Sequence, residues 1–241
     1  MKSLTKCLRG YKTVIFVDLE GTQFSHEVIE IGAYKAFLNE DLTVKKVGRP
    51  FRCFVKAKRP IGAFVEKMTG INEAKLKEEG CTFPLAQQAF RKYVGKDWFR
   101  SIFLTYGNQD AFMMQSSLEH NPEASAEDVR IFRSHNFDFG SFLSSYVRDE
   151  KGNALSLTHA CERLQTSFDG KAHDALDDAK NLMSLYSAFI ERKDIVKAHY
   201  LRILSQGKMM SPSLRKAAIR LAKGEDVSSE MFLSWVGEEL E

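Results

Sequence analysis

One stretch near the start of the chain constrains the fold more than any other: a run of large apolar residues that ends in two carboxylates. Val14–Val17 holds three β-branched residues and one aromatic residue, which is typical of a central strand buried on both faces. Asp18 and Glu20 follow, and they project from the same face because side chains alternate along a strand. Two carboxylates this close repel each other unless a cation neutralises them, and carboxylate oxygen suits a divalent ion. The alternative is that both acids lie in solvent at the strand end.

The composition is that of an ordinary globular chain. Of 241 residues, 44% are hydrophobic and 28% are charged, which fits one medium-sized domain or one domain with an appendage. The net charge is +3, so any affinity for nucleic acid must come from a local patch. The four cysteines are widely spaced, and neither a signal-peptide pattern nor an apolar stretch of membrane-spanning length is found. These features predict a cytoplasmic protein with reduced thiols and no membrane partner.

The first three strands are predicted to form an antiparallel meander. Strand character continues over Val28–Phe37 and Thr43–Lys56, and 39–41 has the composition of a hairpin turn. The first strand is then expected to lie inside the sheet. The other predicted elements are helices over Ile61–Met68, Phe83–Val94, Phe139–Tyr146 and Leu157–Leu164 and a short edge strand near Val129–Phe132.

A second buried strand, Ser101–Tyr106, leads through a turn to Asp110. Asp110 opens the helix predicted over Ala111–Leu118, and an acid at that place is commonly an N-cap. Alternatively, its carboxylate points toward Asp18 and Glu20, because α/β sheets bind ligands at the carboxyl ends of central strands. The sequence leaves both alternatives open.

A third acidic stretch surrounds His173, just ahead of a helical pattern. Asp174 and Asp177 have the spacing of a capping box, and acids in a first turn complement the helix dipole. Asp178 is not needed for capping, and its spacing lets it face the sheet. A lone histidine is more often structural or exposed than catalytic, but His173 lies on a loop that contains Gly170, next to these acids.

Four carboxylates and a histidine on separate elements suit one chemistry well. Two divalent ions can clamp a scissile phosphate, one activating water and the other stabilising the leaving oxygen. A neutral imidazole can take the proton from that water near neutral pH.

Together the motifs resemble those of the DEDDh 3′–5′ exonucleases. Asp18-Leu19-Glu20-Gly21-Thr22 is similar to the first motif of that family, Asp110 to the second, and His173 with Asp178 to the third. Met68-Thr69-Gly70-Ile71 resembles the family's Leu-Thr-Gly-Ile element, which lies beside the terminal bases. The resemblance covers roughly Thr13–Ile190, and spacing and flanks look most like the KapD-like, ribonuclease T-like group that trims histone-message and small-RNA 3′ ends.

The resemblance implies a fold and a set of site residues. The implied fold is a ribonuclease-H-like, mixed five-stranded sheet flanked by helices, with an exonuclease domain at 1–193 and a helical extension at 194–241. The resemblance implies two Mg²⁺ ions, for which Mn²⁺ can substitute, and His173 as general base. The implied metal ligands are Asp18, Glu20, Asp110 and Asp178. The expected substrate contacts are Thr22, Gln23, Phe24, Met68, Thr69, Gly70 and Ile71. Phe24 either stacks on a base or packs in the core.

The tail changes character twice. Ile195–Gly224 is basic and contains no acid, so it either extends a phosphate-binding track or forms a solvated helical face packed on the domain. The last residues, 225–241, are acidic, with an apolar stripe around Trp235 that suits a homodimer contact or an anchoring helix. The basic residues are Lys197, Arg202, Lys208, Arg215, Lys216, Arg220 and Lys223.

The function expected from these features is removal of nucleoside 5′-monophosphates from the 3′ end of single-stranded nucleic acid, with RNA slightly favoured over DNA. One alternative is a module that holds ends without cutting, but unneutralised carboxylates would repel phosphate. Another alternative is a ribonuclease-H-like endonuclease. The His173 loop and Thr69-Gly70-Ile71 favour recognition of an end over cleavage within a strand.

Overall fold

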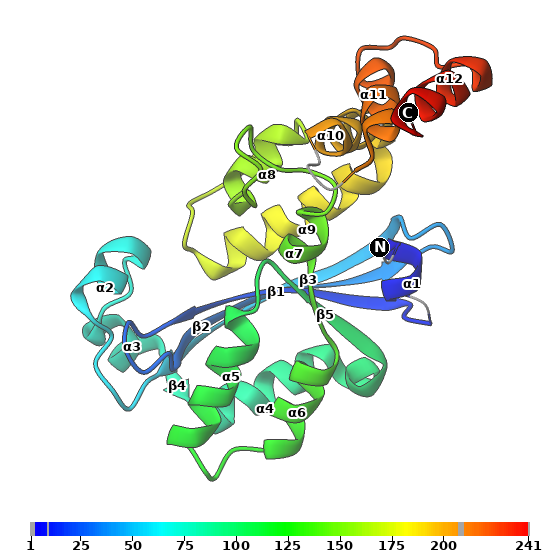
Figure 1. Cartoon of the computed structure of the whole chain (residues 1–241). Coiled ribbons are helices and arrows are strands. Elements are labelled where there is room, and N and C mark those ends of the chain that lie inside the picture. The colour runs from blue at the N-terminus through cyan, green and yellow to red at the C-terminus, as the bar shows by residue number, and fades with distance from the viewer. Residues whose placement is uncertain (1–2, 9, 207–209, 241) are drawn as a thin grey trace.

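A mixed sheet of six strands forms the centre of the part of the chain that the computed structural model describes, residues 3–8, 10–206 and 210–240. The strands are β1 (Thr13–Gly21), β2 (Val28–Leu38), β3 (Val44–Lys56), β4 (Cys81–Thr82), β5 (Ser101–Thr105) and β6 (Asn136–Asp138). They lie in the order β4-β3-β2-β1-β5-β6, with helices on both faces (Figure 1). The predicted α/β class with flanking helices is therefore confirmed.

β1 lies inside the sheet, as its apolar sequence predicts. It pairs antiparallel with β2 on one side and parallel with β5 on the other. β3 pairs antiparallel with β2, which confirms the predicted meander. β4 has two residues, pairs parallel with the end of β3, and adds a sixth strand to the five that were predicted.

Successive residues of β1 belong to two different cores. Val14 and Phe16 lie in one core, and Ile15 and Val17 lie in the other. Because the strand is apolar on both faces and packed on both, it provides a rigid support for the residues at its end. The first core is covered by α1 (Leu4–Leu8), α7 (Phe139–Leu143), α8 (Leu157–Arg163) and α9 (Ala175–Glu191), and the second by α4 (Phe83–Val94), η1 (Gly95–Arg100), α5 (Gln109–His120) and α6 (Ala126–Ser134).

A smaller cluster holds two short helices at one end of the sheet (Figure 1). α2 (Ala63–Thr69) and α3 (Glu73–Glu79) bury Val65 and Leu76 in a cluster that includes Ile29 of β2. The chain just after β1 is tied to this pair, because the Gln23 amide donates a hydrogen bond of 2.8 Å to the Ile61 carbonyl. The start of α2 thus lies near the acidic end of β1.

The prediction of an edge strand near Val129–Phe132 is wrong. These residues lie in α6, whose N-cap Ser125 accepts a hydrogen bond from the Asp128 amide. Val129 and Phe132 are buried on one face at helical spacing, so their period is that of a helix and not of a strand. The edge strand follows directly as β6. The predicted helix over Phe139–Tyr146 ends earlier, at Leu143.

The tail is helical and begins against the first core. α10 (Lys193–Gln206) buries Val196 there, whereas α11 (Pro212–Ala222) and α12 (Ser229–Leu240) pack on each other farther from the sheet (Figure 1). Trp235 of α12 is buried, with the Lys216 ammonium group 5.0 Å from its ring centroid. This packing within the chain favours the anchoring helix for the Trp235 stripe. The division at residue 193 and a homodimer formed through the extension stay predictions.

Several of the basic side chains of the tail are paired with acids. Arg202 forms an ion pair with Glu150, Lys216 with Glu238 and Arg220 with Glu225. Pairing of this kind favours the packed, solvated face over a phosphate track. Lys208 lies outside the described residues.

None of the helices within residues 3–8, 10–206 and 210–240 is both long and apolar enough to cross a membrane. The cytoplasmic location stays a prediction.

Candidate active site

Two of the predicted acids stand at the carboxyl end of β1. Asp18 is half-buried, and Glu20 is buried, opposite Glu30 in the ladder with β2. The pairing of β1 with β2 becomes irregular between Glu20 and Gly21, where the strand ends. The alternative that these acids lie loosely in solvent is therefore excluded for Glu20.

Asp110 joins them from α5. Asn108 holds the N-cap position, and Asp110 is the second residue of the helix. Its Oδ1 accepts a hydrogen bond of 2.9 Å from the Leu19 amide, between the two acids of β1. The sequence left open whether Asp110 caps the helix or points toward Asp18 and Glu20. The structure shows that its carboxylate points toward β1.

The start of α9 brings in Asp178 and His173. Asp178 is buried, and its Oδ2 accepts a hydrogen bond of 2.9 Å from the His173 amide. His173 itself is exposed and has a φ of 64°, in the left-handed region that residues other than glycine rarely adopt. Glu20, His173 and Asp178 each offer one ligand atom within 4.8 Å of the others'. The structure thus brings all five predicted residues to one end of the sheet. They are Asp18, Glu20, Asp110, His173 and Asp178.

The capping box predicted at this helix is only half formed. Asp174 is the N-cap and accepts a hydrogen bond of 3.0 Å from the Asp177 amide. Asp177 does not complete the box, because its Oδ2 accepts from the Lys171 amide at 2.9 Å instead. Gly170 makes this possible, since a Cβ there would lie 2.2 Å from Asp177 Oδ2. Asp177 therefore holds the loop before His173 instead of the helix end.

The four carboxyl groups are costly to ionise where they lie. Burial raises the pKa of Asp18 well above its usual value, and the negative charges of Asp110, Glu20 and Asp178 raise it further. Burial also raises the pKa of Glu20 to about 8, that of Asp110 to about 7 and that of Asp178 to about 6. Divalent cations would relieve this cost, and the oxygen donors are those that Mg²⁺ and Mn²⁺ prefer. The residues present therefore fit a divalent-metal site.

The turn after β1 contains the first group of predicted substrate contacts. Thr22 is buried, and its Oγ1 accepts a hydrogen bond of 2.9 Å from the Glu27 amide. Gln23 Oε1 accepts one of 3.3 Å from the Phe64 amide at the start of α2. Phe24 is 78% exposed, which excludes the alternative that it packs in the core. Thr22 and Gln23 thus shape the turn that presents the Phe24 ring to solvent.

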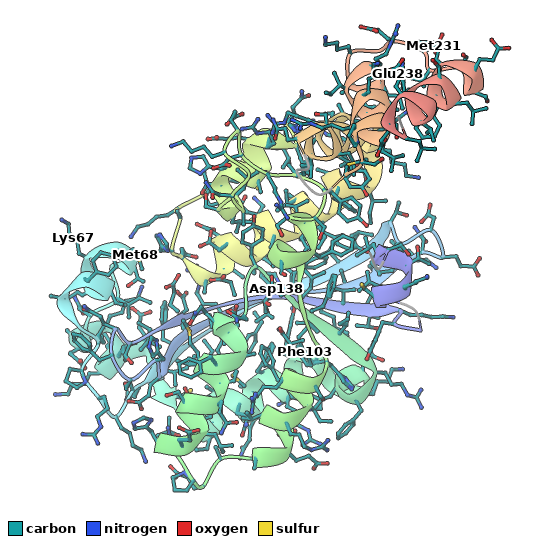
Figure 2. All side chains as sticks on the ribbon, in the orientation of Figure 1. Lys67, Met68, Phe103, Asp138, Met231 and Glu238 are labelled. Carbon is teal, nitrogen blue, oxygen red and sulfur yellow. The ribbon has the colours of Figure 1, made fainter. Side chains whose placement is uncertain are left out.

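The second group lies at the end of α2. Thr69 is buried, and its Oγ1 donates to the Val65 carbonyl at 2.9 Å and accepts from the Ile71 amide at 3.0 Å. Gly70 is the C-cap, with a φ of 78°, and Ile71 is buried in the small third cluster. Gly70 is therefore the exposed residue of this element, and Met68 is half-buried. Figure 2 shows Met68 and Lys67 on α2, at the edge of the molecule.

Three residues near the site escaped the sequence analysis. Glu30 is buried in β2, Arg52 lies between it and Asp174, and Lys171 reaches from the His173 loop to α2. For Glu30 the available signal was a single acid inside an apolar strand. Arg52 and Lys171 gave no such signal, because their partners are far away in the sequence.

The comparisons with known proteins agree with this geometry. The family model RNase_T, described as exonuclease, matches residues 15–186. That match spans more than half of the chain, so the chain belongs to this exonuclease family. The membership confirms the predicted family of DEDDh 3′–5′ exonucleases and the predicted enzyme class, a nuclease. No curated protein matches the sequence significantly.

Several solved structures that share this fold are nucleases. The nuclease domain of 3′hExo, a DEDDh family member bound to rAMP, is 19% identical with a TM-score of 0.61, over 76% of this chain and 94% of that one. A 3′-exonuclease that recognises the 3′ end of the histone mRNA stem-loop is 19% identical with a TM-score of 0.60, over 76% and 64%. Escherichia coli exonuclease I with a dT13 oligonucleotide is 16% identical with a TM-score of 0.57, over 79% and 43%. The chain thus spans less than two thirds of the last two, and the likeness confirms the ribonuclease-H-like fold.

Proposed function

We propose that this protein removes nucleoside 5′-monophosphates one at a time from the 3′ end of single-stranded nucleic acid. The observation that carries the proposal is the meeting of Asp18, Glu20, Asp110 and Asp178 with His173 at the end of β1. Buried carboxyl groups without a cation repel a phosphate, so an arrangement of this kind suits cleavage better than passive binding.

The four carboxylates are proposed to hold two Mg²⁺ ions, for which Mn²⁺ can substitute. When bound, such ions supply Lewis-acid activation of water and charge stabilisation at the scissile phosphate. The protein's own contribution is to hold the oxygen donors rigidly, which β1 does through its two packed faces and Asp110 through its hydrogen bond to Leu19.

His173 is proposed as the general base that accepts the proton of the attacking water. Its backbone is held by Asp178 while its ring is exposed, so the imidazole can meet a substrate from solvent. A ring that reaches the same space as Glu20 and Asp178 could instead be a metal ligand. Metal binding by a His173 variant separates these two roles.

Recognition of the end is proposed for the exposed features on the α2 side of the site. The Phe24 ring offers a face for stacking a base, and the Gly70 backbone can approach a terminal nucleotide closely. RNA is proposed ahead of DNA, because the motif spacing resembles the group that trims RNA 3′ ends. A 2′-hydroxyl contact would be the physical basis of that preference.

The test uses 5′-labelled and 3′-labelled single strands of RNA and DNA with one sequence, in Mg²⁺ or Mn²⁺. We expect a descending ladder from the 5′ label and immediate release of a mononucleotide from the 3′ label. A circular strand of the same composition should stay intact. Cleavage of the circle would establish the endonuclease, and tight binding without products would establish the end-binding module.

A further inference from the structure

A fifth carboxyl group, fully buried, lies beside the site. Glu30 of β2 is 1% exposed and is the ladder partner of Glu20. Its Oε2 accepts a hydrogen bond of 3.3 Å from the Ala175 amide, at the first residue of α9. Its Oε1 lies 3.0 Å from Nε of Arg52. Glu30 therefore connects the strand beside the site to the start of the helix that carries Asp178.

Arg52 extends this connection to the residue next to His173. The same guanidinium group that pairs with Glu30 through Nε also pairs with Asp174 Oδ1 through one of its terminal nitrogens. Arg52 comes from β3, so one side chain joins three separate segments: β3, β2 and the N-cap of α9. The planar, forked shape of a guanidinium suits such a bridge, which a single ammonium group could not reproduce.

The start of α9 has little freedom at this contact. A Cβ on Gly32 of β2 would lie 2.1 Å from the Ala175 backbone, so strand and helix touch directly. His173 lies just before Asp174 in the left-handed conformation, which costs free energy and persists only where the surrounding structure imposes it. Without Arg52, Glu30 and Asp174 would both lose their ion-pair partner beside a four-acid site.

We propose that Arg52 is a positioning residue for His173: its guanidinium, held between Glu30 and Asp174, fixes the loop so that the imidazole faces the four acids. This role rests on the proposed function of His173 as general base. Arg52 does not touch substrate or metal in this assignment. It acts through the backbone of Asp174 on the residue before it.

The test compares three variants of the whole 241-residue chain. Arg52→Met removes the charge and the fork, Arg52→Lys keeps the charge alone, and Arg49→Met removes an exposed arginine from the same strand. We expect Arg52→Met to lower kcat by about tenfold to a hundredfold, the cost of a misplaced catalytic group, with KM near the parent value. Arg52→Lys should recover part of the loss, and Arg49→Met should match the parent. A lowered kcat with equal thermal unfolding temperatures separates positioning from loss of fold.

A double variant decides whether Arg52 acts through His173. In a His173→Ala background the additional Arg52→Met change should lower kcat by less than about twofold, because the group to be positioned is absent. A loss that multiplies with that of His173→Ala would overturn the proposal. So would a kcat of Arg52→Met equal to the parent's.

Failure of this inference is distinguishable from failure of the proposed function. If the parent protein cuts no strand, the His173 ring resonances in the nuclear magnetic resonance spectrum still report the position of the loop. They should move in Arg52→Met and stay in place in Arg49→Met. Unmoved resonances in both variants would remove the positioning role whatever the activity of the parent.

Discussion

The ammonium group of Lys171 donates a hydrogen bond to the carbonyl of Thr69, with 2.9 Å between Nζ and O. The two residues are 102 positions apart in the sequence. One precedes His173 by two positions, and the other ends α2. The contact therefore joins the loop of the proposed general base to the element proposed to meet the terminal nucleotide.

Loss of this contact should weaken strand binding more than chemistry. For Lys171→Met we expect KM to rise about threefold to tenfold, since a hydrogen bond of this kind is worth about 1 kcal/mol, with kcat within about twofold of the parent. Steady-state kinetics on a labelled strand measure both constants. Lys77→Met, an exposed lysine of α3, is the matched control and should leave both unchanged. A fall in kcat with constant KM would show that Lys171 serves the chemistry instead.

Removal of one acid from the site should abolish cleavage without unfolding the protein. Asp18→Ala and Asp178→Ala each delete a proposed metal ligand from a cluster of like charges. In metal-free buffer their unfolding temperatures should equal or exceed the parent's, because repulsion among the remaining acids falls. Mg²⁺ should raise the unfolding temperature of the parent by mass action and that of the variants much less. Parental turnover in either variant would contradict the two-metal assignment.

The stability of the metal-free protein should fall as the pH rises toward 8. The pKa of Glu20 is raised from 4.5 to about 8 in the folded protein, so between these values the folded state binds more protons than the unfolded state. Stability from this group is fully present below the unfolded pKa and is lost as the pH passes through the folded pKa. Asp110 and Asp178, with pKa values raised to about 7 and about 6, act in the same direction.

Thermal unfolding in a chelator, measured from about pH 5 to about pH 8.5, tests this dependence, because the range spans these pKa values. Glu20→Gln should flatten the slope, because the substituted amide does not titrate. Saturating Mg²⁺ should also reduce it by stabilising the ionised acids. A stability that rises over this range in the chelator would show that the acids are already compensated by other groups.

Replacement of His173 should reduce the rate but not the binding of metal. A positioned acid–base group contributes roughly two to four orders of magnitude, and His173→Ala should lose about that much turnover. Divalent-ion and strand binding, measured by calorimetry and fluorescence anisotropy, should stay near the parent level. The acidic limb of the pH–rate profile should change at saturating metal, since an imidazole must be neutral to accept a proton. Loss of metal binding would make His173 a ligand, and unchanged turnover would make it a bystander.

Local sequence patterns were enough to predict the centre of the fold and the acids of the candidate site. The continuous apolar run and the β-branching of Val14–Val17, and the meander after it, are local properties of strands, so they can be recognised without knowledge of the packing. The spacing of Asp18 with Glu20, and of His173 with Asp178, is likewise short-range. Local pattern gives the wrong prediction at Val129–Phe132, because this short apolar run does not show its period. These residues lie in a helix and not in a strand.

The contacts of Asp110, Arg52 and Lys171 could not be predicted from local patterns, because they depend on how the chain packs. Asp110 occupies a position typical of a helix cap in the sequence. Its hydrogen bond from the Leu19 amide depends on how α5 packs beside β1. Arg52 and Lys171 have partners that the chain brings near only after the sheet and α9 have assembled. Their contacts arise because ion pairs and hydrogen bonds depend on distance in space, whereas a sequence pattern carries information about neighbours along the chain.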